Sequence, residues 1–315
     1  TLSPGSGRVN IYSNIIQANL ANDDGGGIRF LMAGNYRFNV YNNMIMNNIS
    51  THEGGGVSLN DAPNVRFYHN TVAKNVTTAT AVTSNGQPAP AGLSTSPNSN
   101  LLQATLPGNA DTFSNPVLFN NIFWDNRAGA WDGDGIAGIG QDGDPNPINN
   151  WDLGLSDLSQ LLEPTNSLLH VTDGTVPDSS NVVGIDPAFI ETYDTTVQAM
   201  PWRTNPNFVG VIMVAVDLPP NLMGNYHIQA TSPAVDIGAA SKQGSSPPAL
   251  DMDGELRLRG LGYDAGADEV NPPAAAPALN APGANAAGNN VQTVIPGSGQ
   301  VLFTKQYFLP ITINQ

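Results

Sequence analysis

Apolar and aromatic residues recur in this chain in short runs, each closed by asparagine. Four segments align: Asn10–Asn19, Asn39–Asn48, Arg66–Asn75 and Val117–Asn126. In each segment one Asn follows the apolar run and a second Asn follows five residues later. The first positions are Asn14, Asn43, Asn70 and Asn121, and the second positions are Asn19, Asn48, Asn75 and Asn126. This pattern predicts two ladders of stacked asparagines.

The spacing of the repeats predicts the fold. Successive Asn positions are separated by 29, 27 and 51 residues, and the last step is either nearly two coils or one coil with a long loop. The glycine triplets Gly25–Gly27 and Gly54–Gly56 are also 29 residues apart, and Gly133–Gly135 stands at nearly the same offset in the fourth repeat. A period in the high twenties, rich in β-branched and aromatic residues, is typical of one turn of a parallel β-solenoid. We therefore expect an all-β, right-handed parallel β-helix.

The physical reason for an asparagine at a fixed place in every coil is the short distance between strands. Strands of successive coils lie about 4.8 Å apart, so an amide side chain can pass a hydrogen bond to the coil above and below. Asparagine also tolerates the left-handed backbone that such turns require. Leucine-rich repeats would need Leu at fixed offsets, and propeller blades would need periods of about 40 residues.

Polar stretches interrupt the coils that we expect within residues 1–183. Residues 77–115 are rich in Thr, Ser, Asn, Pro and Ala and predict a long surface loop, which is either a passive insertion or a binding loop. Residues 132–150 form a second polar insertion. Leucines spaced along Leu153–Leu162 predict a short helix that ends before Pro164.

The last part of the chain changes composition. Residues 208–216 are apolar and predict a buried strand, whereas residues 271–300 are rich in Ala, Pro, Asn and Gly and predict a linker. Residues 301–315 then alternate as a tethered β-strand, with one apolar face made by Val301, Phe303, Tyr307, Leu309, Ile311 and Ile313. Such a strand can cover an open edge of its own coils or add to the edge of a second copy.

Five motifs occur in a fixed order between residues 184 and 270: Gly184–Phe189, Asn225–Gln229, Ser232–Gly238, Asp251–Arg257 and Asp264–Glu269. Together they resemble the choice-of-anchor Q region that follows right-handed parallel β-helix repeats in secreted bacterial proteins. The chain departs from that family in residues 191–223, which are longer than its usual link. The resemblance implies export and surface display, and it implies no catalytic residues.

Charge and composition exclude several classes of function. The net charge is −15 with only eleven Lys and Arg residues, which argues against binding to a nucleic acid backbone. There is no cysteine, which excludes thiolate metal sites and cysteine nucleophiles. The most apolar run covers nine residues, whereas a transmembrane helix needs about 20. Because the β-pattern is already under way at Val9, we expect further sequence before this segment.

Candidate chemistry is concentrated in aspartates. Asp132, Asp134, Asp142 and Asp144 lie in Gly-rich loops of the type that supplies oxygen ligands to Ca²⁺. Asp251 and Asp253 open a second loop of this kind, although the glutamate that would complete an EF-hand is missing. The negative net charge indicates either that the chain binds cations such as Ca²⁺ or only that its surface is soluble.

Signals for an enzyme are weaker. Asp23 and Asp24 are an acidic pair of the type used in acid–base catalysis, and a solvated turn is the alternative interpretation. The four histidines are far apart in the sequence and show no metal-ligand spacing, and His69 fits a polar turn position. Tryptophans that can stack on sugar rings or pack in the core stand at Trp124, Trp131 and Trp151.

We therefore expect a non-catalytic structural or adhesive protein of the cell surface or the extracellular space. Its partners would be further copies of itself, joined into filaments through the C-terminal strand, or surface polysaccharide. The alternative is a polysaccharide-binding or polysaccharide-cleaving β-helix. Ca²⁺ is the candidate cofactor.

Overall fold

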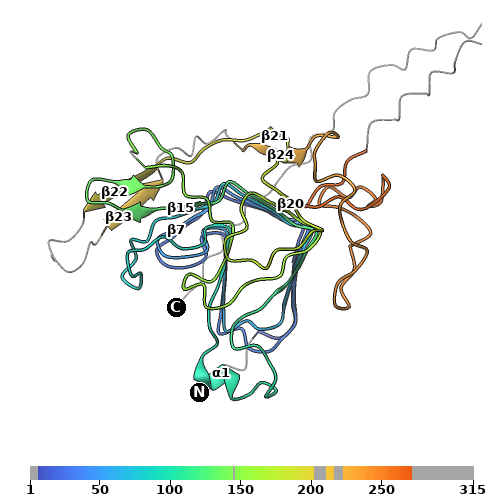
Figure 1. Ribbon diagram of the computed structural model, residues 1–315, viewed down its shortest axis with the longest axis horizontal. Helices are drawn as coiled ribbons and strands as arrows, with labels where there is room; N and C mark the ends of the chain where they lie inside the picture. Colours follow the sequence, from blue (N-terminus) through green and yellow to red (C-terminus); the bar gives the residue numbers. More distant parts are fainter. Residues whose placement is uncertain (1–5, 145, 202–210, 216–222, 272–315) are drawn as a thin grey trace, which may run out of the picture. The chain divides into compact units, whose positions relative to one another are not determined.

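The computed structural model describes residues 6–144, 146–201, 211–215 and 223–271. Its centre is a stack of four coils, each built from short parallel strands, and the fold is an all-β parallel β-helix (Figure 1). No helix in the described ranges is long and apolar enough to cross a membrane. The predicted linker and the predicted strand at residues 301–315 lie outside the described residues.

Each of the four coils contributes one strand to each of four parallel sheets, A to D, and two further strands, β19 and β20, extend sheet B. Sheet A contains β1 (Val9–Tyr12), β5 (Phe38–Tyr41), β9 (Val65–Tyr68) and β13 (Val117–Phe119). Sheet B contains β2 (Ile15–Gln17), β6 (Met44–Met46), β10 (Thr71–Ala73), β14 (Ile122–Trp124), β19 (Leu168–Leu169) and β20 (Val182–Val183). Sheet C contains β3 (Leu20–Ala21), β7 (Ile49–Ser50), β11 (Val76–Thr77) and β15 (Arg127–Ala128). Sheet D contains β4 (Ile28–Leu31), β8 (Val57–Asn60), β12 (Leu93–Thr95) and β18 (Leu153–Gly154).

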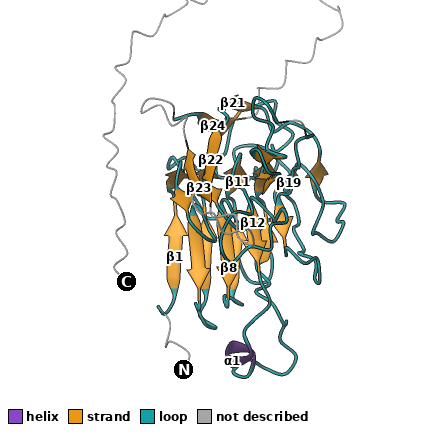
Figure 2. Ribbon diagram, turned by 90° about the vertical axis from the view of Figure 1, so that its left-hand side faces the viewer, coloured by secondary structure: helices purple, strands orange, loops and turns teal. Residues whose placement is uncertain are grey.

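The remaining elements lie outside the four sheets. They are the short helix α1 (Asn100–Gln103) and the antiparallel pairs β16 (Ala130–Trp131) with β17 (Ile136–Ala137), β21 (Phe189–Glu191) with β24 (Asn225–Ile228), and β22 (Val197–Pro201) with β23 (Val211–Ala215). In Figure 2, α1 lies on a loop that projects beyond the strands of the coils.

The core consists of columns of inward-facing side chains, one residue from each coil. One column places Ile11, Val40, Phe67 and Leu118 in register across sheet A. The last three are completely buried, and each buried apolar side chain of this size contributes about 1.5–3 kcal/mol. On the opposite face of the same strands the rings of Tyr12, Tyr41, Tyr68 and Phe119 stack at centroid distances of 5.1 to 5.3 Å.

The 51-residue step is one coil that carries insertions. Val117 pairs directly with Arg66, without an intervening coil. Within the insertion, Leu93 is completely buried and pairs with Val57 in sheet D. The prediction that residues 77–115 form one long surface loop is therefore wrong. The polar composition conceals a strand of three residues, β12, that completes the third coil.

Two further predictions were also wrong. Gly133 and Gly135 lie at the tip of the β16–β17 hairpin, and the corner positions before sheet D in coils three and four are occupied by Gly92 and Asp152. Residues 153–162 form β18 and turns in place of a helix. Leu153 and Leu155 are buried by strand alternation, whereas Leu158 is exposed, so the leucine spacing reflects coil packing.

The segment predicted as a buried strand at residues 208–216 is described in part. Val211–Ala215 forms β23, and the other residues of that range lie outside the described part of the chain.

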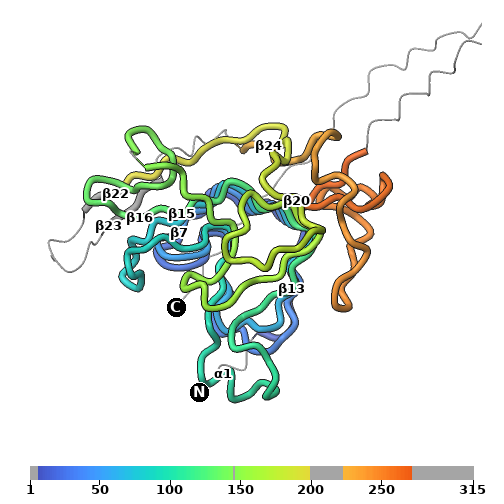
Figure 3. The backbone as a smooth tube through the Cα atoms, viewed as in Figure 1, coloured from blue at the N-terminus to red at the C-terminus, as the bar shows by residue number. Residues whose placement is uncertain are grey.

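Residues 229–271, which follow β24, form a series of turns beside the coils (Figure 3). Its centre is a buried ion pair, with 3.1 Å between the Arg257 guanidinium and the Glu269 carboxylate. Glu269 also accepts hydrogen bonds from the backbone N–H groups of Leu258, Arg259 and Asp264. Burial raises the pKa of Asp264 to about 7, against the effect of two backbone hydrogen bonds. Buried charges need such partners, so a region with little regular structure is held by polar contacts.

Candidate functional site

Both asparagine ladders are continuous chains of amide hydrogen bonds. Asn43 donates through Nδ2 to Asn70 Oδ1 at 2.9 Å and through its backbone N–H to the same oxygen at 3.1 Å. The other links between side chains in the two ladders span 2.8 to 3.3 Å. The first ladder continues to Ser167 and Asn181, and the second ends at the buried carboxylate of Asp152.

The left-handed backbone lies one residue before each ladder position. In the first ladder the preceding residues Asn42, His69 and Asn120 have φ values of +53°, +51° and +55°. In the second ladder Asn47 and Lys74 both have φ of +55°. The prediction that the ladder asparagines adopt this conformation was therefore wrong. The ladder residue points inward, and the strained residue before it turns the chain outward.

The outward residues before the first ladder dock the C-terminal region. Asn42 donates to the carbonyl oxygen of Leu250 at 2.7 Å. Asn120 exchanges two hydrogen bonds with the backbone of Ala239, at 2.8 and 2.7 Å. His69 lies between them and is completely buried; burial and the charge of Arg257 hold its pKa well below the usual value, so it is a neutral turn residue.

The left-handed residues that precede the second ladder bind the segment that follows β21. Asn47 donates to the carbonyl oxygen of Tyr193 at 2.9 Å. Lys74 lies 2.7 Å from Asp125 and 2.5 Å from Asp194, and Arg127 binds the same two carboxylates. These side chains therefore serve attachment between segments distant in sequence.

The four aspartates of the second insertion line one cavity of about 420 Å³. Asp144 Oδ2 accepts hydrogen bonds from the backbone N–H groups of three consecutive residues, 138 to 140, and Oδ1 accepts one from Asn146. These bonds outweigh its desolvation and lower its pKa. Asp132 Oδ1 accepts the N–H groups of Asp134 and Gly135.

Calcium fits this cavity only in part. Asp134 and Asp142 have carboxylates without a hydrogen-bond partner among the described residues, whereas Asp144 uses both oxygens for the loop backbone. The four carboxylates do not gather three oxygens within 4.8 Å of one another, as the residues of two other clusters do. Calcium requires six to eight oxygen ligands, so binding here would require movement of the loops.

Asp251 and Asp253 have separate surroundings. The buried Asp251 accepts the backbone N–H groups of Asp253, Glu255 and Glu269 and holds its own turn together. Asp253 lies 2.6 Å from His227 Nε2, and Asp268 completes that cluster. Asp268 accepts a hydrogen bond from the Ile228 N–H, which ties the cluster to β24.

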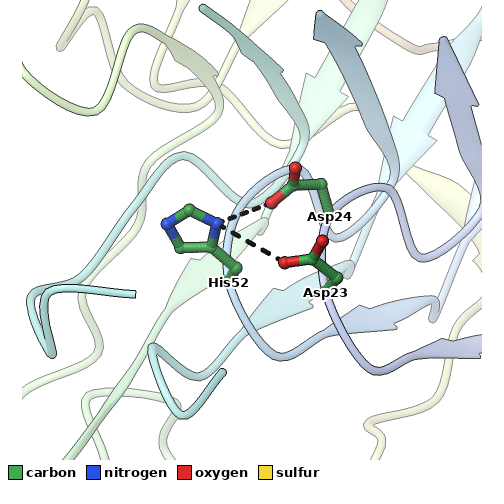
Figure 4. Close-up of side chains that lie close together, drawn as sticks. All are labelled: Asp23, Asp24 and His52. Carbon is green, nitrogen blue, oxygen red and sulfur yellow. Dashed lines mark hydrogen bonds and ion pairs between the residues drawn. The ribbon is translucent and has the colours of Figure 1, made fainter. Parts of the chain in front are cut away.

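A charged cluster at the corner between sheets C and D brings together residues that are separated in the sequence (Figure 4). His52 Nδ1 lies 2.6 Å from Asp24 Oδ1 and 3.9 Å from Asp23 Oδ1. Arg29 closes the cluster with contacts of 2.9 Å to Asp23 and 2.8 Å to Asp24. The hydrogen bond that the His52 ring donates to Asp24 raises the pKa of His52 against the effect of its burial.

Glu53 extends this cluster toward the next coil. Its side chain is buried, burial raises its pKa, and it accepts a hydrogen bond from Ser96. The sequence predicted either an acid–base pair or a solvated turn at Asp23 and Asp24, and their partners Arg29 and His52 were not predicted. A signal was available, since His52 follows Asp23, and Glu53 follows Asp24, by the coil period of 29 residues. Neighbouring carboxyl groups suit acid–base chemistry, but Asp23 and Asp24 are already paired with Arg29.

The tryptophans predicted as candidate sugar platforms are packing residues. The Trp124 ring stacks on His170 with 4.1 Å between centroids. Trp131 packs against a small core cluster, and the indole nitrogen of Trp151 is buried beside Gly154 and Gly174.

Comparisons with known proteins give no family assignment. No protein-family model matches the chain, and neither the curated proteins nor the solved structures contain a match.

The ladders generate a prediction about stability. Replacement Asn75→Ala removes the acceptor of two hydrogen bonds from Asn48 and the donor to Ile45 and Asn126, all in the core. We expect the free energy of unfolding to fall by about 3 kcal/mol or more, because each orphaned buried group costs about 1–3 kcal/mol. Urea denaturation measures this. The control Asn19→Ala, in the exposed first coil, should cost about 1 kcal/mol; equal losses would contradict the prediction.

The corner cluster generates a prediction about pH. The pKa of His52 in the folded protein is above its unfolded value of about 6.5. The stabilisation that charged His52 contributes is therefore complete below about pH 6.5, and it is lost as the pH rises through the folded pKa. We expect His52→Gln to lower stability on the order of 1 kcal/mol at about pH 5.5 and to have little effect at about pH 9. Denaturation across this range measures the difference, and a loss that is independent of pH would refute the role of the charge.

Proposed function

We propose that this protein is a non-catalytic structural and adhesive protein of the cell surface or extracellular space, which assembles through its C-terminal strand. The observation that carries this proposal is the edge presented by the first coil. Within the described residues, strands β1, β2, β3 and β4 each stand at the end of their sheet and pair with a neighbour on one side.

The exposed edge has the chemistry of an acceptor for a further strand. Asn14 and Asn19 donate to the second coil, and within the described residues their Oδ1 atoms accept no hydrogen bond. Tyr12, Leu20 and Leu31 on this coil are 53%, 45% and 50% exposed. An unpaired edge with apolar side chains favours the addition of another strand.

The C-terminal segment has the sequence that such an edge requires. Residues 301–315 alternate apolar and polar positions, and the linker of thirty residues before them has a typical span of about 30 Å. Addition to the first coil of a second copy is a heterologous contact, and repetition of that contact builds a filament. The resemblance to surface-displayed β-helix proteins supports an extracellular location.

The proposal is also supported by the carboxylates of the described clusters, several of which are bound to other groups of the chain; Asp134 and Asp142 are exceptions. Asp24 and Asp125 each contact a cation, and Asp144 and Asp251 are saturated by backbone N–H groups. Carboxylates committed in this way serve the fold.

The experiment is removal of residues 301–315. We expect the full chain to form polymers whose mass rises with concentration, and the truncated chain to remain monomeric while it keeps its β-sheet circular dichroism. Analytical ultracentrifugation and electron microscopy measure this.

Two point variants refine the test. Phe303→Asp, on the apolar face, should reduce assembly at least about tenfold, because a charge placed in an apolar contact costs several kcal/mol. The matched control Gln306→Asp, on the polar face, should leave assembly intact. Polymers that persist after truncation, or a full chain that stays monomeric at every concentration, would overturn the proposal.

A further inference from the structure

The insertion between β12 and β13 is a fixed structure with a cavity. Pro97 pairs with Phe113 in an antiparallel bridge, which closes the base of the inserted loop. Phe113 and Leu102 are almost completely buried and anchor the loop on the core. The backbone N–H of Ser99 donates to Asp61 at 2.6 Å, which ties the loop to the second coil. The side chains that line the cavity are therefore held by a rigid frame.

The cavity lies between this insertion and residues 159 and 160, and its volume is about 440 Å³. Small-molecule pockets have volumes of about 300–1,000 Å³. Its polar lining consists of amide and hydroxyl side chains: Asn98, Asn100, Gln103, Thr112, Ser159 and Gln160. No lining side chain is charged, although the chain as a whole carries a net charge of −15.

Part of this lining is ready to bind. Asn98 donates to Gln103 Oε1 at 3.0 Å and to the carbonyl oxygen of Asp111, which fixes the orientation of both amides. Gln103 Nε2 and the amides of Asn100 and Gln160 have no hydrogen-bond partner in the described part of the chain. Each free amide offers donors and an acceptor within one plane. Vicinal hydroxyl groups, which both donate and accept, match that arrangement.

The apolar part of the lining is made by Pro97 and Phe113. Exposed leucines adjoin the lining residues in the sequence and do not themselves line the cavity. Leu101 follows Asn100 and is 59% exposed. Leu158 and Leu161 flank residues 159 and 160 and are 52% and 44% exposed. Leu158 also has a φ of +52°, an uncommon conformation for a bulky side chain. Apolar groups beside amides suit a ligand with both C–H faces and hydroxyl edges.

We propose that this cavity binds a neutral polysaccharide, with the amides of Gln103, Asn100 and Gln160 on its hydroxyl groups and the apolar lining residues Pro97 and Phe113 on its C–H faces. An acidic polysaccharide is disfavoured by the negative field of the chain. A cationic ligand finds no carboxylate in the lining. This site lies outside the assembly edge and goes beyond the proposed function, since it does not need the C-terminal strand.

The test uses the full chain. An array of neutral and acidic oligosaccharides identifies binding, and calorimetric titration with the best neutral oligosaccharide measures its affinity. We expect Gln160→Ala to weaken binding about tenfold, the effect of losing one or two hydrogen bonds. Gln160 makes no side-chain hydrogen bond within the described structure, so this variant should fold normally; Gln103→Ala should weaken binding by a similar factor.

The matched control is Gln87→Ala, an exposed glutamine on the other inserted loop of the same coil. It should bind as the unmodified chain does. Absence of binding to every neutral oligosaccharide, preference for acidic ones, or equal affinity of Gln160→Ala and Gln87→Ala would each overturn the proposal. Binding is measured independently of assembly, so failure here would leave the filament proposal standing.

Discussion

The buried amide hydrogen bond between asparagines of successive coils is the interaction on which the rest of this structure depends. Each inner ladder amide bridges two coils and satisfies backbone groups in both, as Asn70 does with the carbonyl oxygens of Val40 and Tyr68. Buried backbone groups need such partners wherever the chain turns out of a sheet. The ladders therefore fix the register of the coils, and the apolar columns follow from that register.

The same turns attach the rest of the chain. The residue before each ladder asparagine is left-handed and faces outward, so the coils present side chains at the same places on their surface, polar at each of them except Ala18. Asn42 and Asn120 use this position to hold turns of residues 223–271, and Asn47 and Lys74 use it to hold residues 193–195. One turn geometry thus supports the core on its inner side and the docking of distant segments on its outer side.

The sequence predicted those features that recur in every coil. The fold class and the steps of 29 and 27 residues were predictable because every coil repeats the same turn. Strand β12 was missed because its three residues lie among polar insertions, and the leucines of residues 153–162 resembled a helix because coil packing can imitate helical spacing. The contact of Asp24 with His52 depends on the coil period, because His52 follows Asp23, and Glu53 follows Asp24, by 29 residues. The prediction used that period for the asparagines and the glycine triplets and not for these charged residues. The cavity at Gln103 and Gln160 joins two irregular loops, for which no sequence rule places side chains.

The ladders also have an electrical direction. The links between ladder side chains all run from the first coil toward the fourth, although each inner amide also donates to a backbone carbonyl of the preceding coil. The C=O groups of the ladder amides therefore share one direction, and their dipoles add along the stack. The positive end of the second ladder meets the carboxylate of Asp152, an anion placed where the summed field favours it. At the opposite end the Oδ1 atoms of Asn14 and Asn19 accept no hydrogen bond among the described residues. Along the ladders the stack is thus polar, and its two ends have opposite hydrogen-bonding character.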